Sequence, residues 1–180
     1  MTFDPADSTS APDLEAEIVP GVRAAGFALG ETYDSIARRI GHVEWYQADA
    51  SLESIIVNNS AWIGVNWPVG TALKLGKTIQ SFVYKDNIVR LLFGESKRLY
   101  RIAIGRGYQG RFHQVLPGDD LSLLESSFEL DFNDHDEDFL ILKDGHFVEG
   151  ISFITDYRAS LEHAPDQTIE HISVHNWSLR

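Results

Sequence analysis

The chain contains no cysteine, which excludes disulfides, thiolate metal sites and cysteine nucleophiles. It also has no apolar run near the roughly 20 residues that are needed to span a bilayer. Its first twenty residues, MTFDPADSTSAPDLEAEIVP, lack both the basic region and the apolar region of a secretory signal. These absences predict a cytoplasmic protein that does not associate with a membrane.

Familiar catalytic patterns are missing as well. The sequence has no GxSxG, SxxK or HExxH motif. Carboxylates are so numerous that no particular pair stands out as a glycosidase-like acid and base. We therefore predict that the protein is not an enzyme and that it uses no cofactor and no metal.

Positive charge is scarce overall but concentrated in the middle of the chain. The net charge is -12. Residues 1–73 carry ten acids and three bases, and residues 112–180 carry fifteen acids and three bases. Residues 74–111, in contrast, carry nine bases and two acids. The basic middle either offsets a neighbouring acidic segment or forms a patch opposite an acidic one. An acidic surface repels phosphates, so we expect no direct binding of nucleic acid.

The apolar content suits one folded domain. With 43% hydrophobic residues in 180, the chain can bury a core without cross-links. Residues 1–17 show no apolar periodicity and are predicted to be a disordered or loosely attached arm, which leaves 18–180 as the domain. A helix is predicted over 31–40, because apolar residues recur there at helical spacing and Gly41 follows as a stop.

Hairpins dominate the rest of the prediction. Three turn-forming stretches lie between β-prone runs: Asn58-Asn59-Ser60 within 54–65, Asp86-Asn87 within 79–93, and Asp144-Gly145 within 139–155. Further strands are predicted at 99–104 and at 168–174, where the last strand could close a sheet. A second short helix is predicted after Asp119 or Asp120, either of which can cap it, and runs to about Phe128.

The two parts of the chain share a short pattern. GVRAAG before LGETYDSI is echoed by GRGYQG before PGDDLSLL. Because the echo is short, duplication and chance both stay open. The predicted fold class is α+β: antiparallel β-sheets built from hairpins with one or two short helices, arranged as one domain or as a tandem pseudo-repeat with halves near 18–104 and 105–180.

The stretch GRGYQG, with Gly105, Gly107 and Gly110, matches the GxGxxG pattern of nucleotide-binding loops and follows a predicted strand. A dinucleotide loop needs a helix that begins within it, since the amides of that helix bind the pyrophosphate. Here Pro117 and Gly118 stop any such helix within two turns. The glycines are therefore predicted to shape a tight joint, and a nucleotide or other small ligand at this loop is the alternative.

An acidic run, DFNDHDED, occupies residues 131–138. A calcium loop that starts at Asp134 fails, because Phe139 stands where an EF-hand has glycine and Gly145 where it has glutamate. A solvated loop or a contact surface for a basic partner is the better interpretation, and a divalent site of another kind is the lesser one. The candidate partner-binding residues are Asp131, Asp134, Asp136, Glu137 and Asp138.

Two histidines, His171 and His175, lie four residues apart in a predicted strand, so both should point to one face. A metal site would need a third ligand that the spacing does not supply, and exposed strand histidines are the more common case. The four tryptophans are interpreted as core residues rather than as a carbohydrate-binding platform.

The second half resembles the small immunity proteins that accompany bacterial polymorphic toxins, including those of contact-dependent growth inhibition. The resemblance covers residues 99–155 and rests on the spacing of GRGYQGRF, PGDDLSLL, FNDHDEDF and VEGISF. Membership would imply a non-enzymatic cytoplasmic protein that binds a cognate toxin domain, such as a basic nuclease, and blocks its active site. A generic protein-interaction domain is the other alternative. The helix-plus-sheet design is also similar to β-lactamase inhibitory proteins, at fold level only.

Overall fold

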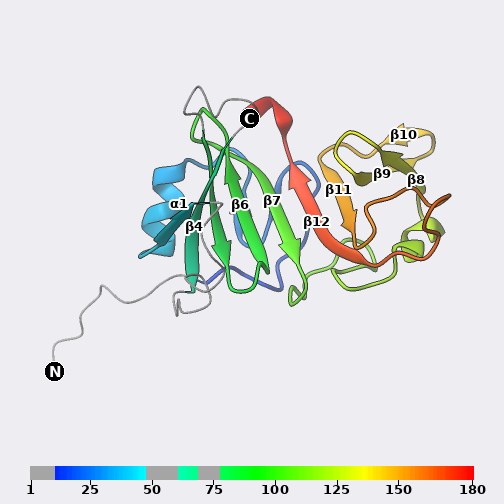
Figure 1. Cartoon of the computed structure of the whole chain (residues 1–180), viewed down its shortest axis with the longest axis horizontal. Helices are drawn as coiled ribbons and strands as arrows, with labels where there is room; N and C mark the ends of the chain where they lie inside the picture. Colours follow the sequence, from blue (N-terminus) through cyan, green and yellow to red (C-terminus); the bar gives the residue numbers. More distant parts are fainter. Residues whose placement is uncertain (1–10, 48–60, 69–77) are drawn as a thin grey trace.

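A computed structural model describes residues 11–47, 61–68 and 78–180. Within these residues ten strands form one mixed, mostly antiparallel sheet (Figure 1). The order across the sheet is β10-β9-β11-β12-β7-β6-β5-β4-β3, and β8 pairs with β9. The strands are β3 (Glu44–Gln47), β4 (Trp62–Pro68), β5 (Thr78–Tyr84), β6 (Val89–Phe93), β7 (Leu99–Gly105), β8 (Glu129–Asn133), β9 (Asp138–Lys143), β10 (His146–Phe147), β11 (Ile151–Thr155) and β12 (Ile169–His175).

The chain approaches the middle of this sheet from both edges. Strands β3 to β7 run in sequence order from one edge to the centre, whereas β8, β9, β11 and β12 run inward from the other (Figure 1). The two series meet where β12 pairs antiparallel with β7, so that His175 stands opposite Arg101. Strand β12, drawn in red, therefore joins both parts of the sheet.

Helix α1 (Tyr33–Ile40) forms where the sequence predicts it. Thr32 caps it by accepting a hydrogen bond from the Ser35 amide at 3.3 Å, and Gly41 ends it with a φ of +78°. Ile36 is fully buried, and the ring of Tyr33 packs against Phe82 of β5 and Phe93 of β6. A two-stranded hairpin, β1 (Arg23–Ala24) and β2 (Phe27–Ala28), precedes the helix.

The two faces of the central strands differ in chemistry. Side chains that alternate along paired strands share a face, and one face is apolar and fully buried, with Leu91, Ile102, Phe153 and Ile172 in the core. The opposite face carries charge and hydroxyls. We call it the polar face and define it by Arg90 of β6, Arg101 of β7, and His171, Ser173 and His175 of β12.

The predicted α+β class is only partly right, because the protein is mostly β. The expected second helix is a short 3-10 segment, η3 (Leu121–Ser126), and Asp120 caps it by accepting from the Ser122 amide at 2.8 Å. The expected separate sheets merge into one, in which β3 and β4 pair in parallel. A second 3-10 turn, η4 (Trp177–Leu179), follows β12.

The hairpin predictions have mixed outcomes. The hairpin of β5 and β6 is confirmed, and Asp86 and Asn87 in its turn have positive φ. Asp144-Gly145 does turn the chain, but β10 is only two residues long and β11 follows as a separate strand beside β9. The hairpin predicted at 54–65 falls largely outside the described residues.

Candidate functional site

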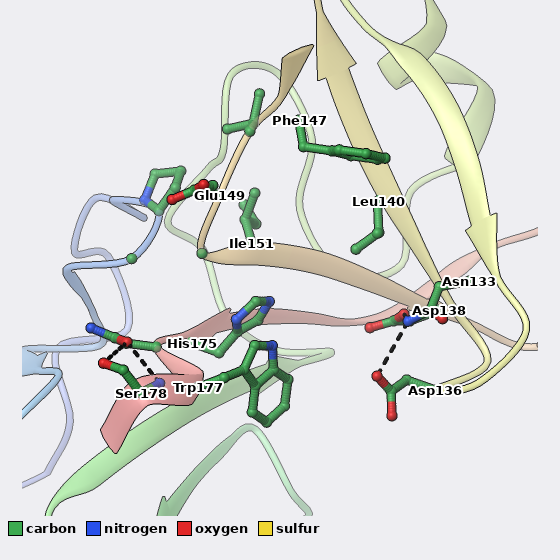
Figure 2. A pocket seen from close by; sticks show the side chains of 15 residues that line it. Asn133, Asp136, Asp138, Leu140, Phe147, Glu149, Ile151, His175, Trp177 and Ser178 are labelled. Carbon is green, nitrogen blue, oxygen red and sulfur yellow. Dashed lines mark hydrogen bonds between the residues drawn. The ribbon is translucent and has the colours of Figure 1, made fainter. Parts of the chain in front are cut away.

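A groove of about 630 Å³ opens where the β8–β9 turn, the β10–β11 connection and the residues after β12 meet (Figure 2). Three carboxylates line it: Asp136 and Asp138 lie on one side, and Glu149 lies on the other (Figure 2). The remaining lining residues are Pro20, Gly21, Asn133, Leu140, Phe147, Val148, Gly150, Ile151, His175, Asn176, Trp177 and Ser178.

Asn133, the last residue of β8, organises the acidic side of the groove. Its Nδ2 donates to Asp136 at 3.2 Å and to Asp138 at 3.0 Å, and its Oδ1 accepts from the His135 amide at 3.2 Å. Asp138 is only 5% exposed, whereas Asp136 is exposed. The amide of Asn133 thus holds two carboxylates close together, and the exposed one is available to a partner.

Two aromatic side chains give the groove an apolar surface. Phe147 is 53% exposed and Trp177 is 42% exposed, which is unusual for side chains of this size. The Trp177 ring stacks on His175, with 4.6 Å between ring centroids and 29° between planes. The guanidinium of Arg101 lies 5.8 Å from the same indole. Trp177 is therefore held in place while part of its ring faces solvent.

The imidazole of His175 lines the groove and is uncharged near neutral pH. It is 8% exposed, and burial lowers the pKa of its imidazole below the usual value. The positive charge of Arg101 lowers that pKa further, while Asp138 and Asp136 act in the opposite direction. The ring therefore stacks on Trp177 without adding positive charge to the groove.

Of the five predicted partner-binding residues, two line the groove and three do not. Asp136 and Asp138 line the groove, as described above. Asp131 lies in β8 opposite Leu140, while Asp134 and Glu137 are exposed in the β8–β9 turn, and these three do not line it. The acidic run is therefore part strand and part turn rather than one loop.

Sequence reasoning missed the other half of the groove. Glu149, Phe147 and Trp177 come from two other segments of the chain, and only the sheet topology brings them together. Trp177 and Trp45 were predicted to be core, but both are partly exposed, whereas Trp62 is fully buried as expected. Phe147 lies two residues after Gly145 of the Asp144-Gly145 turn, and an aromatic residue close to a hairpin turn was the one available signal.

Backbone amides of the GRGYQG loop are hydrogen-bonded to another segment of the same chain. The amides of Gln109 and Gly110 both donate to the Leu14 carbonyl, at 2.8 and 3.0 Å. A Cβ at Gly110 would lie 2.0 Å from the carbonyl oxygen of Ala16. The residues that were assigned to a loose arm therefore include a stretch, around 13–16, that packs on this loop, and the loop's amides already have an acceptor.

His171 and His175 do share a face of β12, as the alternation predicts. His171 is engaged by Asn87, whose Nδ2 lies 2.9 Å from its Nε2. No group of three or more histidine or acidic side chains in the described residues could hold a metal ion. In the same part of the chain, no helix is long and apolar enough to cross a membrane.

No protein-family model, curated protein or solved structure matches this chain. The chemistry of the groove and of the polar face beside it therefore carries the inferences that follow.

Proposed function

We propose that this chain is a non-catalytic immunity protein, which binds a cognate bacterial toxin domain through the groove and neutralises it. One observation carries the proposal: carboxylates stand on both sides of a groove whose surface includes two exposed aromatic rings. The resemblance of residues 99–155 to immunity proteins supplies the biological context.

The composition of the groove supports the proposal of a protein interface. Interface energy concentrates in a few residues, with aromatic side chains prominent among them, surrounded by a polar rim. Phe147 and Trp177 supply the aromatic anchors, and Asp136 and Glu149 supply the rim. A lysine or arginine of the partner would meet a carboxylate on either side and an aromatic face between them.

Electrostatics favours a basic partner. The protein has a net charge of -12, and the acids that flank the groove add to a field that attracts positive surfaces. Toxins that cut nucleic acids present basic clefts, and opposite charge raises the rate of association more than it lowers the rate of dissociation. We therefore expect a one-to-one complex with a basic toxin domain.

The test uses the toxin domain encoded beside the gene for this chain. Isothermal titration calorimetry should give a one-to-one complex, and co-expression should protect cells from the toxin. The double variant Asp136→Asn with Glu149→Gln should bind about tenfold more weakly or worse, because two charged contacts are lost. The matched control neutralises two exposed acids outside the groove, Asp34→Asn with Glu162→Gln, and should bind like the natural protein.

Two results would go against the proposal. If the Asp136 and Glu149 variant binds the toxin normally, the groove is not the contact surface. If no toxin domain binds and no cell is protected, the immunity role is wrong, and a generic interaction domain becomes the better reading. A nucleotide at the Gly105, Gly107 and Gly110 loop gains no support from the geometry, since Leu14 occupies the amides.

We also propose that the chain is a tandem pseudo-repeat. The support is topological: in each part a helical segment, α1 or η3, precedes the strands of the large sheet, and those strands then run inward to β7 or β12. Two fragments, 18–104 and 105–180, should then reassociate when co-expressed, by pairing β7 with β12. Failure of the fragments to form a complex would count against two self-contained halves.

A further inference from the structure

Two arginines on the polar face lack a counter-charge. Arg90 and Arg101 are both partly buried, and neither has a carboxylate within 4.0 Å among the described residues. A guanidinium that loses water without gaining an anion costs free energy, so buried charges are normally paired. This pair is an exception that needs an explanation.

The register places the two arginines close together on the polar face. Arg90 of β6 and Ser173 of β12 both stand opposite Ala103 of β7. Arg101 lies two residues before Ala103 on β7 and so shares its face, and its Nε donates to the Ser173 hydroxyl at 2.6 Å. The small side chain of Ala103 therefore lies between Arg90 and Ser173 in the register.

Each arginine makes its hydrogen bond through Nε, and each guanidinium also lies near an indole ring, with Arg90 5.3 Å from Trp67 and Arg101 5.8 Å from Trp177. Arg90 donates from Nε to the Asn87 side-chain oxygen at 3.0 Å, and Arg101 donates from Nε to Ser173. Within the described residues, the Nη atoms of both arginines make no hydrogen bond. Their terminal donors are thus held in place and remain free, which is the arrangement that recognises an oxyanion.

A hydrogen-bond chain keeps the neighbouring histidine neutral. Asn87 accepts from Arg90 with its oxygen, so its Nδ2 is left to donate to Nε2 of His171. Burial lowers the pKa of His171 to about 4, and the charges of Arg90, Arg101 and Arg158 contribute to the same shift. His171 is therefore neutral near neutral pH and leaves the charge of the arginines unchanged, and Arg158 adds a third positive charge from the loop after β11.

The two acids that act on Arg101 through space do not neutralise the cluster. Asp136 and Asp138 influence Arg101 through space, but they are not within salt-bridge distance of it, and Asn133 holds both. Ser152, opposite Ser173 on β11, has a buried hydroxyl oxygen with no hydrogen-bond partner among the described residues. The polar face thus holds unused donors and unbalanced positive charge together.

We infer that Arg90 and Arg101, with Arg158 at the rim, form a binding site for a phosphate-class oxyanion on the polar face. None of the three arginines lines the groove that the proposed function uses, although Arg101 contacts Trp177 at its edge, and the inference requires no toxin. A phosphate group would accept from the free Nη donors of both arginines and supply the counter-charge that the fold leaves out. The same chemistry fits inorganic phosphate or the phosphate of a small ester.

The experiment titrates the full chain with inorganic phosphate near neutral pH, against sodium chloride at matched ionic strength. Calorimetry and thermal unfolding should both show saturable binding, because a ligand specific for the folded state raises the melting temperature. Arg90→Gln and Arg101→Gln should each weaken phosphate binding by about tenfold or more. The control Arg38→Gln removes an exposed arginine of α1 and should leave the affinity unchanged.

A third variant and two further ligands complete the experiment. If the Arg90 or Arg101 variant does not fold, Arg158→Gln removes an exposed arginine and should still weaken phosphate binding severalfold. A titration with adenosine monophosphate tests whether the site accepts a phosphate ester. Binding as tight as that of inorganic phosphate would show that it does. The inference is overturned if phosphate gives no saturable signal, if folded Arg90 and Arg101 variants bind it normally, or if succinate binds and phosphate does not.

Discussion

The imidazole ring of His171 lies against the Cα of Gly105, its partner across β12 and β7. A Cβ at Gly105 would lie 3.1 Å from two ring atoms of His171 and 2.8 Å from the carbonyl oxygen of Asn87. The first glycine of the GxGxxG pattern therefore makes room for a side chain of the protein itself. It allows His171 to reach the Asn87 side chain across β7.

The variant Gly105→Ala should therefore destabilise the protein, by about 1–3 kcal/mol, because a methyl group is forced into filled space. Urea unfolding followed by tryptophan fluorescence measures the change. In a His171→Ala background the same substitution should cost less, since one of its two contacts is gone, although the Asn87 carbonyl remains. An equal cost in both backgrounds would show that His171 does not occupy this space.

The stability of the protein should depend on pH through His171. Its folded pKa is about 4, below the ordinary value of 6.5. As the pH falls, His171 therefore takes up a proton in the unfolded chain before it does so in the folded protein. The contribution of neutral His171 to the unfolding free energy is fully present above about pH 6.5 and is lost as the pH falls toward 4.

Comparison with His171→Gln isolates this contribution. Carboxylates and His175 also titrate in the acidic range, but they are common to both proteins. The difference in unfolding free energy between the two proteins should shrink as the pH falls from 6.5 to 4. A difference that stays constant over that range would mean that His171 is not held neutral.

Gly110→Ala should release the segment around 13–16 from the glycine loop. The added Cβ would lie 2.0 Å from the Ala16 carbonyl oxygen, which is too close for any packing adjustment short of moving the backbone. Hydrogen exchange should increase at Gln109, whose amide donates to Leu14 in the natural protein. Gly145→Ala is the control for backbone strain without a clash: its φ of +75° strains an alanine, but the added Cβ meets nothing within 4 Å, so exchange at Gln109 should not change.

Tyr108→Phe should cost about 2 kcal/mol of stability, measured by urea unfolding. The ring of Tyr108 is fully buried, and its hydroxyl accepts from the Ala25 amide at 2.9 Å and donates to the Ala16 carbonyl at 2.7 Å. Removing the hydroxyl leaves both backbone groups without a partner. The control, Tyr157→Phe, alters a ring that is 65% exposed and should change the stability little. Similar costs for both variants would contradict this role.

Local signals in the sequence predicted the local elements well. Helix α1 follows from apolar spacing and a terminal Gly41, and the β5–β6 turn follows from Asp86 and Asn87, which tolerate positive φ. Strand β8 was missed because acidic residues alternate with Leu130 and Phe132, and the acids hid the two-residue period. These two apolar side chains pack against the core, which decides the conformation.

The order of the strands across the sheet could not be predicted from the sequence. The strand at 168–174 was predicted to close a sheet, and β12 instead lies between β7 and β11. Part of the candidate groove was anticipated through Asp136 and Asp138. The remaining part depends on which strands become neighbours, and that is determined by packing across the whole sheet rather than by any local pattern.

The central position of β12 has a consequence for biosynthesis. Until residues 169–175 leave the ribosome, β7 and β11 each present an edge with unpaired backbone groups, and such edges pair readily with other chains. The nascent protein is thus prone to aggregate while β7 and β11 are formed and β12 is still absent. Chaperone dependence should accordingly fall once β12 becomes available.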